Sequence, residues 1–408
     1  MNLNEIKETK KGIFSVCTGN FDVLKITLEY MRDKDITFII ESTSNQVNQE
    51  GGYTGFKPVD FVRKLKKLAD EVGFDFGRII LGGDHLGPLP WRKLAPEKAM
   101  EKGRKMVESY VKAGYRKIHL DTSFPLGDEK DIPPEVAASR QADLCEVAEK
   151  TWKEEGLKPP VYVLGTEVPP AGGVVNEEEY ITTAEEFERT VSITEEIFKK
   201  RGLEDAWNRV IAFVVQPGVE FYKDGIRLYE PTKVKDLSAS GKKHHFVFEA
   251  HSTDFQPLEN LSRMVKDGFS ILKVGPELTF KFREGLFALE RIEKEFGLNP
   301  SGFSEALLLA MKENPKYWQN YYKDGSKIDM KYSLLDRVRY YLPNDRVKKA
   351  KEELFENFKD KKLNLGVISQ YFPDLFWDVL SGKIKPYGTD LVKAKVGRSI
   401  QRYIDATS

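Results

Sequence analysis

The sequence predicts an α/β protein built as a (β/α)8 barrel, the TIM-barrel fold, with an additional helical region at the C-terminal end. Eight short apolar runs alternate with longer amphipathic runs up to about residue 296. Such alternation indicates parallel strands joined by right-handed crossovers, and eight units favour a closed barrel over an open sheet. No Gly-x-Gly-x-x-Gly motif follows the first run, so a dinucleotide-binding open sheet loses its main support.

The expected strands share apolar and β-branched side chains, as is typical of parallel strands that are buried on both faces. In order, they are residues 13–18, 36–42, 78–83, 116–121, 161–167, 209–215, 245–250 and 270–274. Most are followed by a run that has the apolar periodicity of a helix. The expected helices are residues 20–33, 58–73, 96–113, 134–155, 182–201, 256–267 and 276–296, with a loop and a short helix after the sixth strand.

The strand signal ends near residue 298, and the remaining sequence has the patterning of helices only. We therefore expect residues 1–298 to form the barrel, which carries the metal and the active site. Residues 299–408 are expected to form a helical C-terminal region packed on the barrel. A length of 408 residues fits a barrel of ~250 residues plus such an appendage.

Charge and cysteine content exclude several classes of protein. Lysine plus arginine equal aspartate plus glutamate at 64 each, so no net positive field attracts nucleic acid or an anionic membrane. Only two cysteines occur, and no run of 18 apolar residues is present. We expect a cytoplasmic protein that binds a small molecule and neither nucleic acid nor a membrane.

Polar residues follow the expected strands at their C-terminal ends, where the chemistry of a TIM barrel collects. Three of the five histidines, His85, His119 and His251, lie at the ends of three different strands. Histidines and carboxylates that converge at one barrel mouth are typical metal ligands. The alternatives are ordinary hydrogen-bonded histidines for His85 and His251, and a supporting role for His119 with Asp121.

Four further polar residues are candidates at the same strand ends. Glu41 ends the second strand, and Glu167 follows an apolar run in which a surface carboxylate is hard to explain. Gln216 follows the sixth strand and is either a ligand or a buried amide bonded to the backbone. Lys273 is either a Schiff-base amine or a lysine paired to a carboxylate, and the pair is favoured.

The loop over residues 44–56 is rich in amides and glycines, which suits a polyhydroxylated ligand better than a plain surface turn. Asn45, Gln46, Gln49 and Tyr53 are its candidate sugar contacts. In the helical region, Asp336 and Arg339 either cover the barrel mouth or belong to a solvated helix face. We include all of these, with Glu41, His119, Asp121 and Lys273, among the candidate substrate-binding residues.

Seven motifs make the chain similar to the family of the Z-type subunit of tagatose-bisphosphate aldolase, which includes tagatose 4-epimerases and is related to class II aldolases. The motifs run in order through nearly the whole chain: IIESTSNQVNQEGGYTGF, LGGDHLGPLPW, KIHLDTS, GTEVPPAGG, FEAHSTDFQ, LKVGPELTF and YSLLDRVRYY. The resemblance implies that Asp84-His85, Glu167 and His251 match the aldolase motif, and Gln216 stands at the remaining ligand position. It implies one divalent metal on His85, Gln216 and His251, with zinc favoured and manganese, nickel or cobalt as alternatives.

The sequence after His251 departs from the class II pattern. Ser252, Thr253 and Asp254 replace a glycine-rich phosphate loop, so a non-phosphorylated ketohexose is expected. The expected activity is that of an isomerase, a tagatose/fructose 4-epimerase that breaks and rejoins the bond between carbons three and four. Asp84 or Glu167 would be the catalytic base.

Two alternatives stay open at this point. One is a non-catalytic stabilising subunit of tagatose-1,6-bisphosphate aldolase, and the other is a class II aldolase itself. The expected partners are a ketose substrate and either further copies of the chain or an aldolase partner subunit. A kinase is disfavoured because the sequence contains no P-loop.

Overall fold

Eight parallel strands close into a barrel in the computed structural model, which describes residues 3–9, 11–165, 179–322 and 325–408. The strand order is β1-β10-β9-β6-β5-β4-β3-β2, so that β1 pairs with both β2 and β10. The barrel strands are β1 (Ile13–Cys17), β2 (Phe38–Thr43), β3 (Ile79–Leu86), β4 (Lys117–Leu120), β5 (Val161–Leu164), β6 (Val210–Val214), β9 (Val247–Ala250) and β10 (Ile271–Val274). The predicted (β/α)8 barrel is confirmed, and each expected strand is present within a few residues of its predicted bounds.

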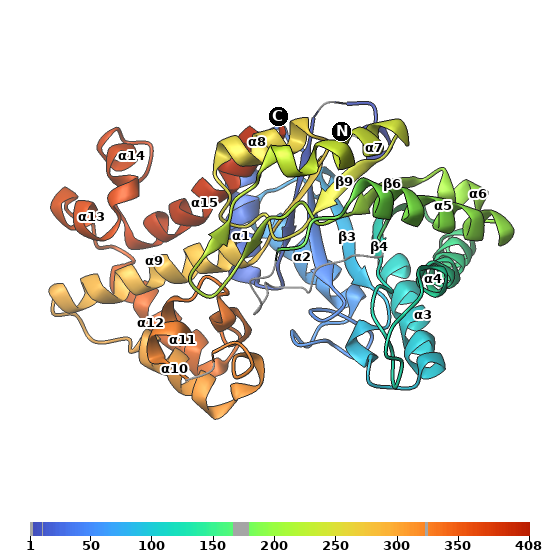
Figure 1. Ribbon diagram of the computed structural model, residues 1–408. Coiled ribbons are helices and arrows are strands. Elements are labelled where there is room, and N and C mark those ends of the chain that lie inside the picture. Colours follow the sequence, from blue (N-terminus) through green and yellow to red (C-terminus); the bar gives the residue numbers. More distant parts are fainter. Residues whose placement is uncertain (1–2, 10, 166–178, 323–324) are drawn as a thin grey trace.

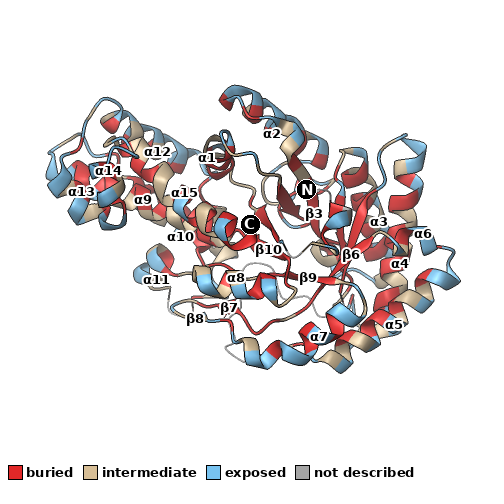
Figure 2. Ribbon diagram, turned by 90° about the horizontal axis from the view of Figure 1, so that it is seen from above, coloured by how far each residue is buried: buried red, intermediate tan, exposed pale blue. Residues whose placement is uncertain are grey.

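Helices surround the barrel (Figure 1), and their exposed residues lie on the outside (Figure 2). They are α1 (Phe21–Met31), α2 (Pro58–Val72), α3 (Pro96–Lys112), α4 (Pro134–Glu154), α5 (Ala184–Lys200), α7 (Lys235–Lys243), α8 (Leu258–Lys266) and α9 (Pro276–Glu295). Three elements after the fifth strand were not predicted: the short helix α6 (Glu204–Trp207) and the antiparallel pair β7 (Glu220–Phe221) and β8 (Ile226–Arg227). The pair is too short to give a periodic signal.

The inside of the barrel is apolar at one end and charged at the other. Strand side chains alternate between the two faces of the sheet, so every second residue points inward. Ile39, Val247 and Ile271 belong to a buried apolar cluster that includes Leu3 of the N-terminal turn η1 (Leu3–Glu5). Two positions further along the same strands stand Glu41, Glu249 and Lys273, all buried. The C-terminal half of the barrel interior is therefore polar, and it positions the site.

The chain after α9 is helical, as predicted. Its helices are α10 (Phe303–Glu313), α11 (Lys327–Tyr332), α12 (Asp345–Phe358), α13 (Leu365–Tyr371), α14 (Phe376–Leu380) and α15 (Gly388–Thr407), with the turn η6 (Arg337–Tyr340) between α11 and α12. Figure 1 shows α10 to α14 gathered to one side of the barrel, at the far end of α9.

The last helix, α15, returns to the barrel and packs against α1, α8, α9 and β1. A Cβ on Gly397 would come within 2.6 Å of the Tyr30 ring on α1, so this packing requires glycine. The division at residue 298 stays a prediction, because the wall of the barrel includes residues from both sides of it.

None of the helices within the described residues is long and apolar enough to cross a membrane.

Candidate functional site

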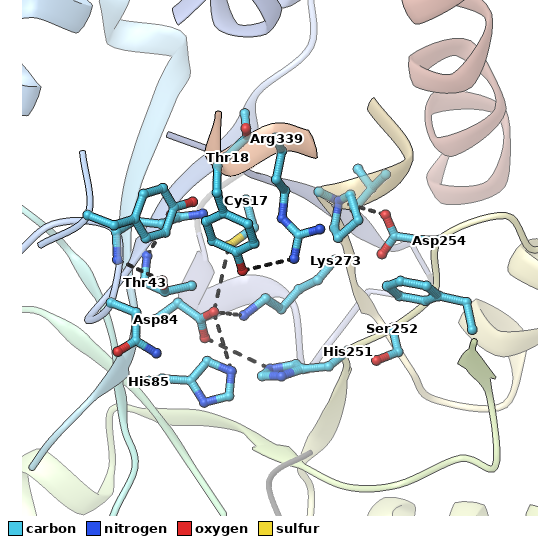
Figure 3. A pocket seen from close by; sticks show the side chains of 18 residues that line it. Cys17, Thr18, Thr43, Asp84, His85, His251, Ser252, Asp254, Lys273 and Arg339 are labelled. Atoms are coloured by element: carbon cyan, nitrogen blue, oxygen red, sulfur yellow. Dashed lines mark hydrogen bonds and ion pairs between the residues drawn. The ribbon is translucent and has the colours of Figure 1, made fainter. Parts of the chain in front are cut away.

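A pocket opens at the C-terminal ends of the barrel strands, where the sequence predicts the site (Figure 3). Eight of the candidate residues line it: Asn45, Gln46, Tyr53, Asp84, His85, His251, Lys273 and Arg339. The remaining lining residues are Cys17, Thr18, Thr43, Phe221, Ser252, Asp254, Val274, Gly275, Pro276 and Tyr340. Loop 44–56, the strand ends and η6 of the helical region thus meet around one cavity.

Other candidates lie beneath or beside this pocket. Glu41, His119 and Asp121 are buried below its floor. Gln49 does not line the pocket, since its amide donates to the carbonyl of Lys102 at 3.0 Å.

Asp336 and Gln216 do not line the pocket, and a third candidate lies outside the described residues. Asp336 is buried and accepts hydrogen bonds from Thr279 at 2.6 Å and from Arg283 Nε at 2.9 Å, so it anchors η6. Gln216 follows β6, and its backbone N–H donates to Thr182 Oγ1 at 2.9 Å. Glu167 lies outside the described residues. Ligand roles for His85 and Gln216, and catalysis by Glu167, stay predictions.

Asp84 is the centre of the site. Its Oδ1 lies 2.8 Å from His119 Nδ1 and 4.0 Å from His251 Nε2. Its Oδ2 pairs with the ammonium of Lys273 and lies 3.7 Å from His85 Nε2. Burial opposes ionisation of Asp84, but the charges of His85 and Lys273 outweigh it and hold its pKa well below the usual range. Asp84 is therefore a carboxylate at neutral pH.

Strand β3 is irregular where it delivers this aspartate. Its pairing with β4 shifts between Gly83 and Leu86, and His85 has a φ of 49°, which non-glycine residues rarely adopt. Gly82 has no room for a side chain, because a Cβ there would lie 2.6 Å from the Glu41 side chain. Strained backbone of this kind is concentrated at functional sites. It directs His85 Nδ1 to Asp121, 2.9 Å away.

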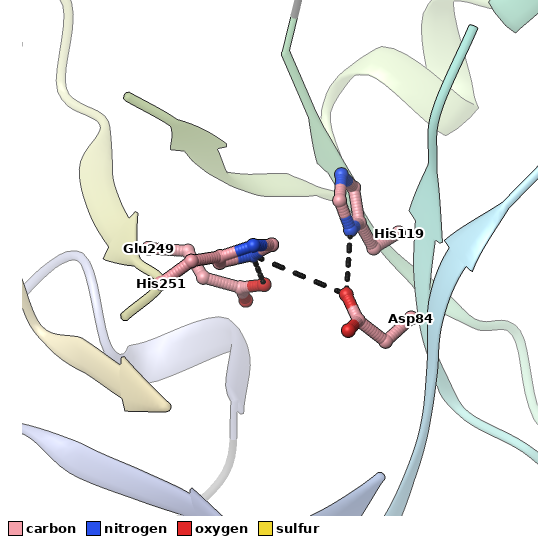
Figure 4. Close-up of side chains that lie close together, drawn as sticks. All are labelled: Asp84, His119, Glu249 and His251. Carbon is pink, nitrogen blue, oxygen red and sulfur yellow. Dashed lines mark hydrogen bonds and ion pairs between the residues drawn. The ribbon is translucent and has the colours of Figure 1, made fainter. Parts of the chain in front are cut away.

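Four buried side chains could hold a metal ion: Asp84, His119, Glu249 and His251 (Figure 4). One ligand atom from each lies within 4.8 Å of the others. Ligand atoms at ~2.0–2.2 Å from one ion lie within roughly 4.4 Å of one another, so small side-chain movements would close this set. His119 turns its Nδ1 toward Asp84, and its Nε2 points away from the other three side chains (Figure 4). The donors fit a divalent transition metal.

Two buried lysines lie among the carboxylates under the pocket. Lys117 forms ion pairs with Glu41 and Glu249, and its side chain is completely buried. Lys273 pairs with Asp84 and lies 3.2 Å from Glu41 Oε2. Because these residues come from strands on different sides of the barrel, they can meet only inside it. The pairing favoured for Lys273 from the sequence is thus confirmed.

The buried group has an excess of negative charge. It comprises four carboxylates, those of Glu41, Asp84, Asp121 and Glu249, and two ammonium groups. Even with the His85 ring counted as a cation beside Asp84 and Asp121, a net charge of minus one is left, which a bound cation would offset. Uncompensated buried charge is costly, so this excess is a second argument that the group fits a metal.

The histidines differ in charge. Burial and the nearby Lys273 lower the pKa of His251 to about 3, so its imidazole is neutral, the form that binds metals. Burial also opposes charge on His85, but Asp84 and Asp121 outweigh it and raise the pKa of that ring. His251 therefore has the protonation state of a ligand, whereas His85 has the environment of a cation paired with carboxylates.

The C-terminal helix holds the loop that carries His251. Tyr403 on α15 donates a hydrogen bond to the Thr253 carbonyl at 2.7 Å, and Thr253 donates to the Lys273 carbonyl at 2.6 Å. Asp254 Oδ1 accepts the N–H groups of Gly275 and Glu277 at 3.0 and 2.7 Å, so it caps α9. The loop between β9 and α8 is thus fixed by elements far apart in the sequence.

Glu220 on β7 is a buried carboxyl beside this loop, and we expect it to make stability depend on pH. Burial raises its pKa from 4.5 to about 7. A raised folded-state pKa means that its contribution to stability is complete below pH 4.5 and is lost as the pH rises through about 7. Glu220→Gln should flatten the pH dependence of the unfolding midpoint in this interval. Chemical unfolding across pH tests this, with Glu259→Gln on the exposed face of α8 as control; an unchanged profile would contradict the assignment.

Comparison with known proteins decides the family. The chain matches the family described as D-tagatose-1,6-bisphosphate aldolase subunit GatZ/KbaZ-like over residues 1–408. The chain belongs to the GatZ/KbaZ-like family. It is 42% identical over 400 residues to the D-tagatose-1,6-bisphosphate aldolase subunit GatZ of Escherichia coli, covering 96% of this chain and 95% of that one. The GatZ protein of Shigella flexneri is similar to the same extent.

A solved structure of a relative supports the same conclusion. The crystal structure of a probable tagatose 6 phosphate kinase from Sinorhizobium meliloti 1021 has a TM-score of 0.89 and 36% identity, covering 97% of this chain and 100% of that one. The predicted resemblance to this family is therefore confirmed.

The predicted isomerase activity is wrong. Relatives that match this chain over nearly their whole length are named as subunits of an aldolase, which points to a lyase. The argument for a non-phosphorylated sugar also loses its support. The names of the relatives contain a bisphosphate, and Asp254, which replaces the phosphate loop, uses one oxygen to cap α9 in this GatZ/KbaZ-like chain.

Sequence reasoning missed several residues of the site, notably Lys117, Cys17 and Tyr340. Lys117 stands two positions before His119, and strand alternation puts both on the inner face of β4. That periodicity could have identified Lys117 and, two positions before His251, Glu249. Nothing in the sequence distinguishes Cys17, whose Sγ lies 3.7 Å from Asp84 Oδ2.

Proposed function

We propose that this chain is a component of a metal-dependent aldolase for a ketose bisphosphate, and that its own pocket binds the ketose and one divalent ion. The observation that carries the proposal is the group of Asp84, His119, Glu249 and His251 at the barrel mouth, buried and with an excess of negative charge. The names of its relatives supply the substrate class.

The ion would supply Lewis acidity at the ketose carbonyl. Asp84, His119, Glu249 and His251 are the residues that would hold it, with zinc favoured by nitrogen and oxygen donors and manganese, nickel and cobalt as alternatives. Lys117 beside Glu249, and Lys273 beside Asp84, keep the carboxylates ionised and in place.

The reaction breaks the bond between carbons three and four of the ketose. A base removes the proton from the hydroxyl on carbon four, whose oxygen becomes the aldehyde of one product. The electron pair of the broken bond stays on carbon three and is delocalised onto the adjoining carbonyl. Protonation of carbon three then restores the carbonyl and gives the second product. The candidate bases are Glu167 and, if His119, Glu249 and His251 hold the ion without it, Asp84. Asn45, Gln46 and Tyr53 line the same pocket and would bind the sugar hydroxyls.

The rival function is a stabilising subunit whose pocket does not react. It is favoured by the word subunit in the names of the relatives, which implies a second aldolase chain. In our proposal such a partner assembles with this chain, and this chain keeps its own metal and ketose pocket.

An activity assay of the purified chain tests the proposal. The chain is assayed alone and mixed with a class II aldolase subunit. D-tagatose 1,6-bisphosphate is added with zinc, and triose phosphate release is measured. We expect release that EDTA abolishes and zinc restores, and that Asp84→Asn in this chain lowers by ~10²–10⁴-fold. Release that is unchanged by Asp84→Asn, with a longer lifetime of the added aldolase subunit, would overturn the proposal in favour of the stabilising subunit.

A further inference from the structure

The pocket wall contributed by the helical region carries a positive charge. Arg339 of η6 lines the pocket on the side away from His85 and His251 (Figure 3), and Tyr340 and Tyr53 line the same pocket. Neutral groups hold its guanidinium in position. It donates to the carbonyls of Leu335 and Asp336 and to the Tyr340 hydroxyl, the last at 3.0 Å.

Within the part of the chain that the structure describes, Arg339 forms no ion pair. Asp336, the nearest carboxylate in the sequence, is already bound to Thr279 and to the buried Arg283. Asp254 acts on Arg339 from across the pocket, but burial and Glu277 raise the pKa of Asp254 to about 7. That carboxyl is only partly ionised near neutral pH. A guanidinium that is fixed in a pocket without a matching carboxylate is typical of an anion-binding position.

The other candidate for an anion at this pocket is the N-terminus of α9, which Gly275 and Pro276 bring to the wall. Helix N-termini bind phosphates through free N–H groups. Here the N–H groups of Gly275 and Glu277 already bond to Asp254, and Pro276 has none. An anionic ligand group is therefore directed to Arg339 and away from the helix end.

The surroundings of Arg339 suit the end of a sugar derivative. The rings of Tyr53 and Tyr340 pack edge to face with centroids 4.8 Å apart, and Tyr340 stacks on Tyr317. This aromatic packing fixes the Tyr340 hydroxyl that supports the guanidinium. Asn45 and Gln46 add neutral donors and acceptors to the same wall.

We propose that Arg339 and Tyr340 form a subsite for an anionic group, a phosphate or a carboxylate, at the end of the ketose remote from the metal group. The subsite makes the helical region part of substrate selection, since η6 contributes both residues. The inference rests on the proposed function for the identity of the ketose, but the preference for an anion is measured by binding and does not require turnover.

Calorimetric titration of the full chain loaded with zinc tests the subsite with three ligands that differ at one carbon. These are D-tagatose, D-tagatose 6-phosphate and D-tagaturonate, which end in a hydroxyl, a phosphate and a carboxylate. We expect wild-type protein to bind at least one anion ~10- to 100-fold more tightly than D-tagatose, the size of a charge-assisted hydrogen bond. The more strongly bound anion identifies the group that the subsite accepts.

Arg339→Gln should weaken binding of the anion far more than binding of D-tagatose, so that the two affinities become similar, and Arg339→Lys should keep part of the difference. Arg346→Gln is the matched control, because Arg346 is an exposed arginine of the same region that pairs with Glu313. Equal wild-type affinity for all three ligands would overturn the subsite, as would an Arg339→Gln variant that weakens all three alike. If Arg339→Gln fails to fold, the affinities of the wild-type protein and of Arg339→Lys for the three ligands still test the subsite. Anion preference without triose phosphate release would support the subsite while contradicting the proposed reaction.

Discussion

Replacing His251 with alanine is expected to lower the affinity for divalent metal by at least ~100-fold. Its Nε2 lies 3.1 Å from Glu249 Oε1 and 4.0 Å from Asp84 Oδ1, inside the group that could hold the ion. Burial and Lys273 keep its imidazole neutral, so the ring offers a lone pair without first losing a proton. Loss of a residue that only orients a ligand costs about 10–100-fold, and loss of a ligand costs more. Competition with a chromophoric chelator measures the affinity.

The same titration distinguishes two ligand sets. His119→Ala should resemble His251→Ala if the buried group of four holds the ion, and His85→Ala should then show the smaller loss of an orienting residue. The set inferred from the aldolase resemblance predicts the reverse order, with large losses for His85→Ala and Gln216→Ala. His245→Asn is the control, because His245 is exposed and precedes β9 at the opposite end of the barrel. If His251→Ala binds metal as tightly as the wild-type protein, the proposed metal site is wrong.

Lys117→Met is expected to lower the free energy of unfolding by about 3–5 kcal/mol, the range for breaking a buried ion pair from one side. The Lys117 ammonium is completely buried between Glu41 and Glu249, and its loss leaves two carboxylates without their counter-ion. Burial raises the pKa of Glu249, but Lys117 and His251 outweigh it and lower that pKa. Because the pKa of Glu249 is lowered in the folded protein, its ionised carboxylate stabilises the fold above pH 4.5, the unfolded value. This stabilisation is lost as the pH falls. The destabilisation should therefore be largest near neutral pH and shrink in acid.

Denaturant unfolding at several pH values measures this effect. Lys112→Met on the exposed face of α3 is the matched control, since Lys112 forms surface pairs with Glu108 and Glu155 and should change stability little. The double variant Lys117→Met/Glu249→Gln should recover part of the loss, because it removes one uncompensated charge. If Lys117→Met is as stable as the control, the buried carboxylates of Glu41 and Glu249 do not need this ammonium as their counter-ion.

The sequence by itself determined the barrel and the end of it that carries the site. Eight apolar strands separated by amphipathic helices leave a closed parallel sheet as the stable arrangement, and polar residues at strand ends then gather at one mouth. Asp84, His251 and Lys273 could be assigned to this mouth because each ends a strand or directly follows one. The resemblance of the motifs gave the family, but the activity drawn from it was wrong.

Only the tertiary structure decided which polar atoms meet. The irregularity of β3 turns His85 toward Asp121 and leaves His119 beside Asp84, although the sequence presents His85 as the stronger candidate. The ion pair of Lys117 with Glu249 likewise joins residues that are 132 positions apart in the chain. Strand periodicity fixes the face on which a side chain lies, whereas the distance between two side chains depends on barrel closure, strand register and a few strained dihedral angles. Those quantities are set by packing throughout the molecule, so no local pattern records them.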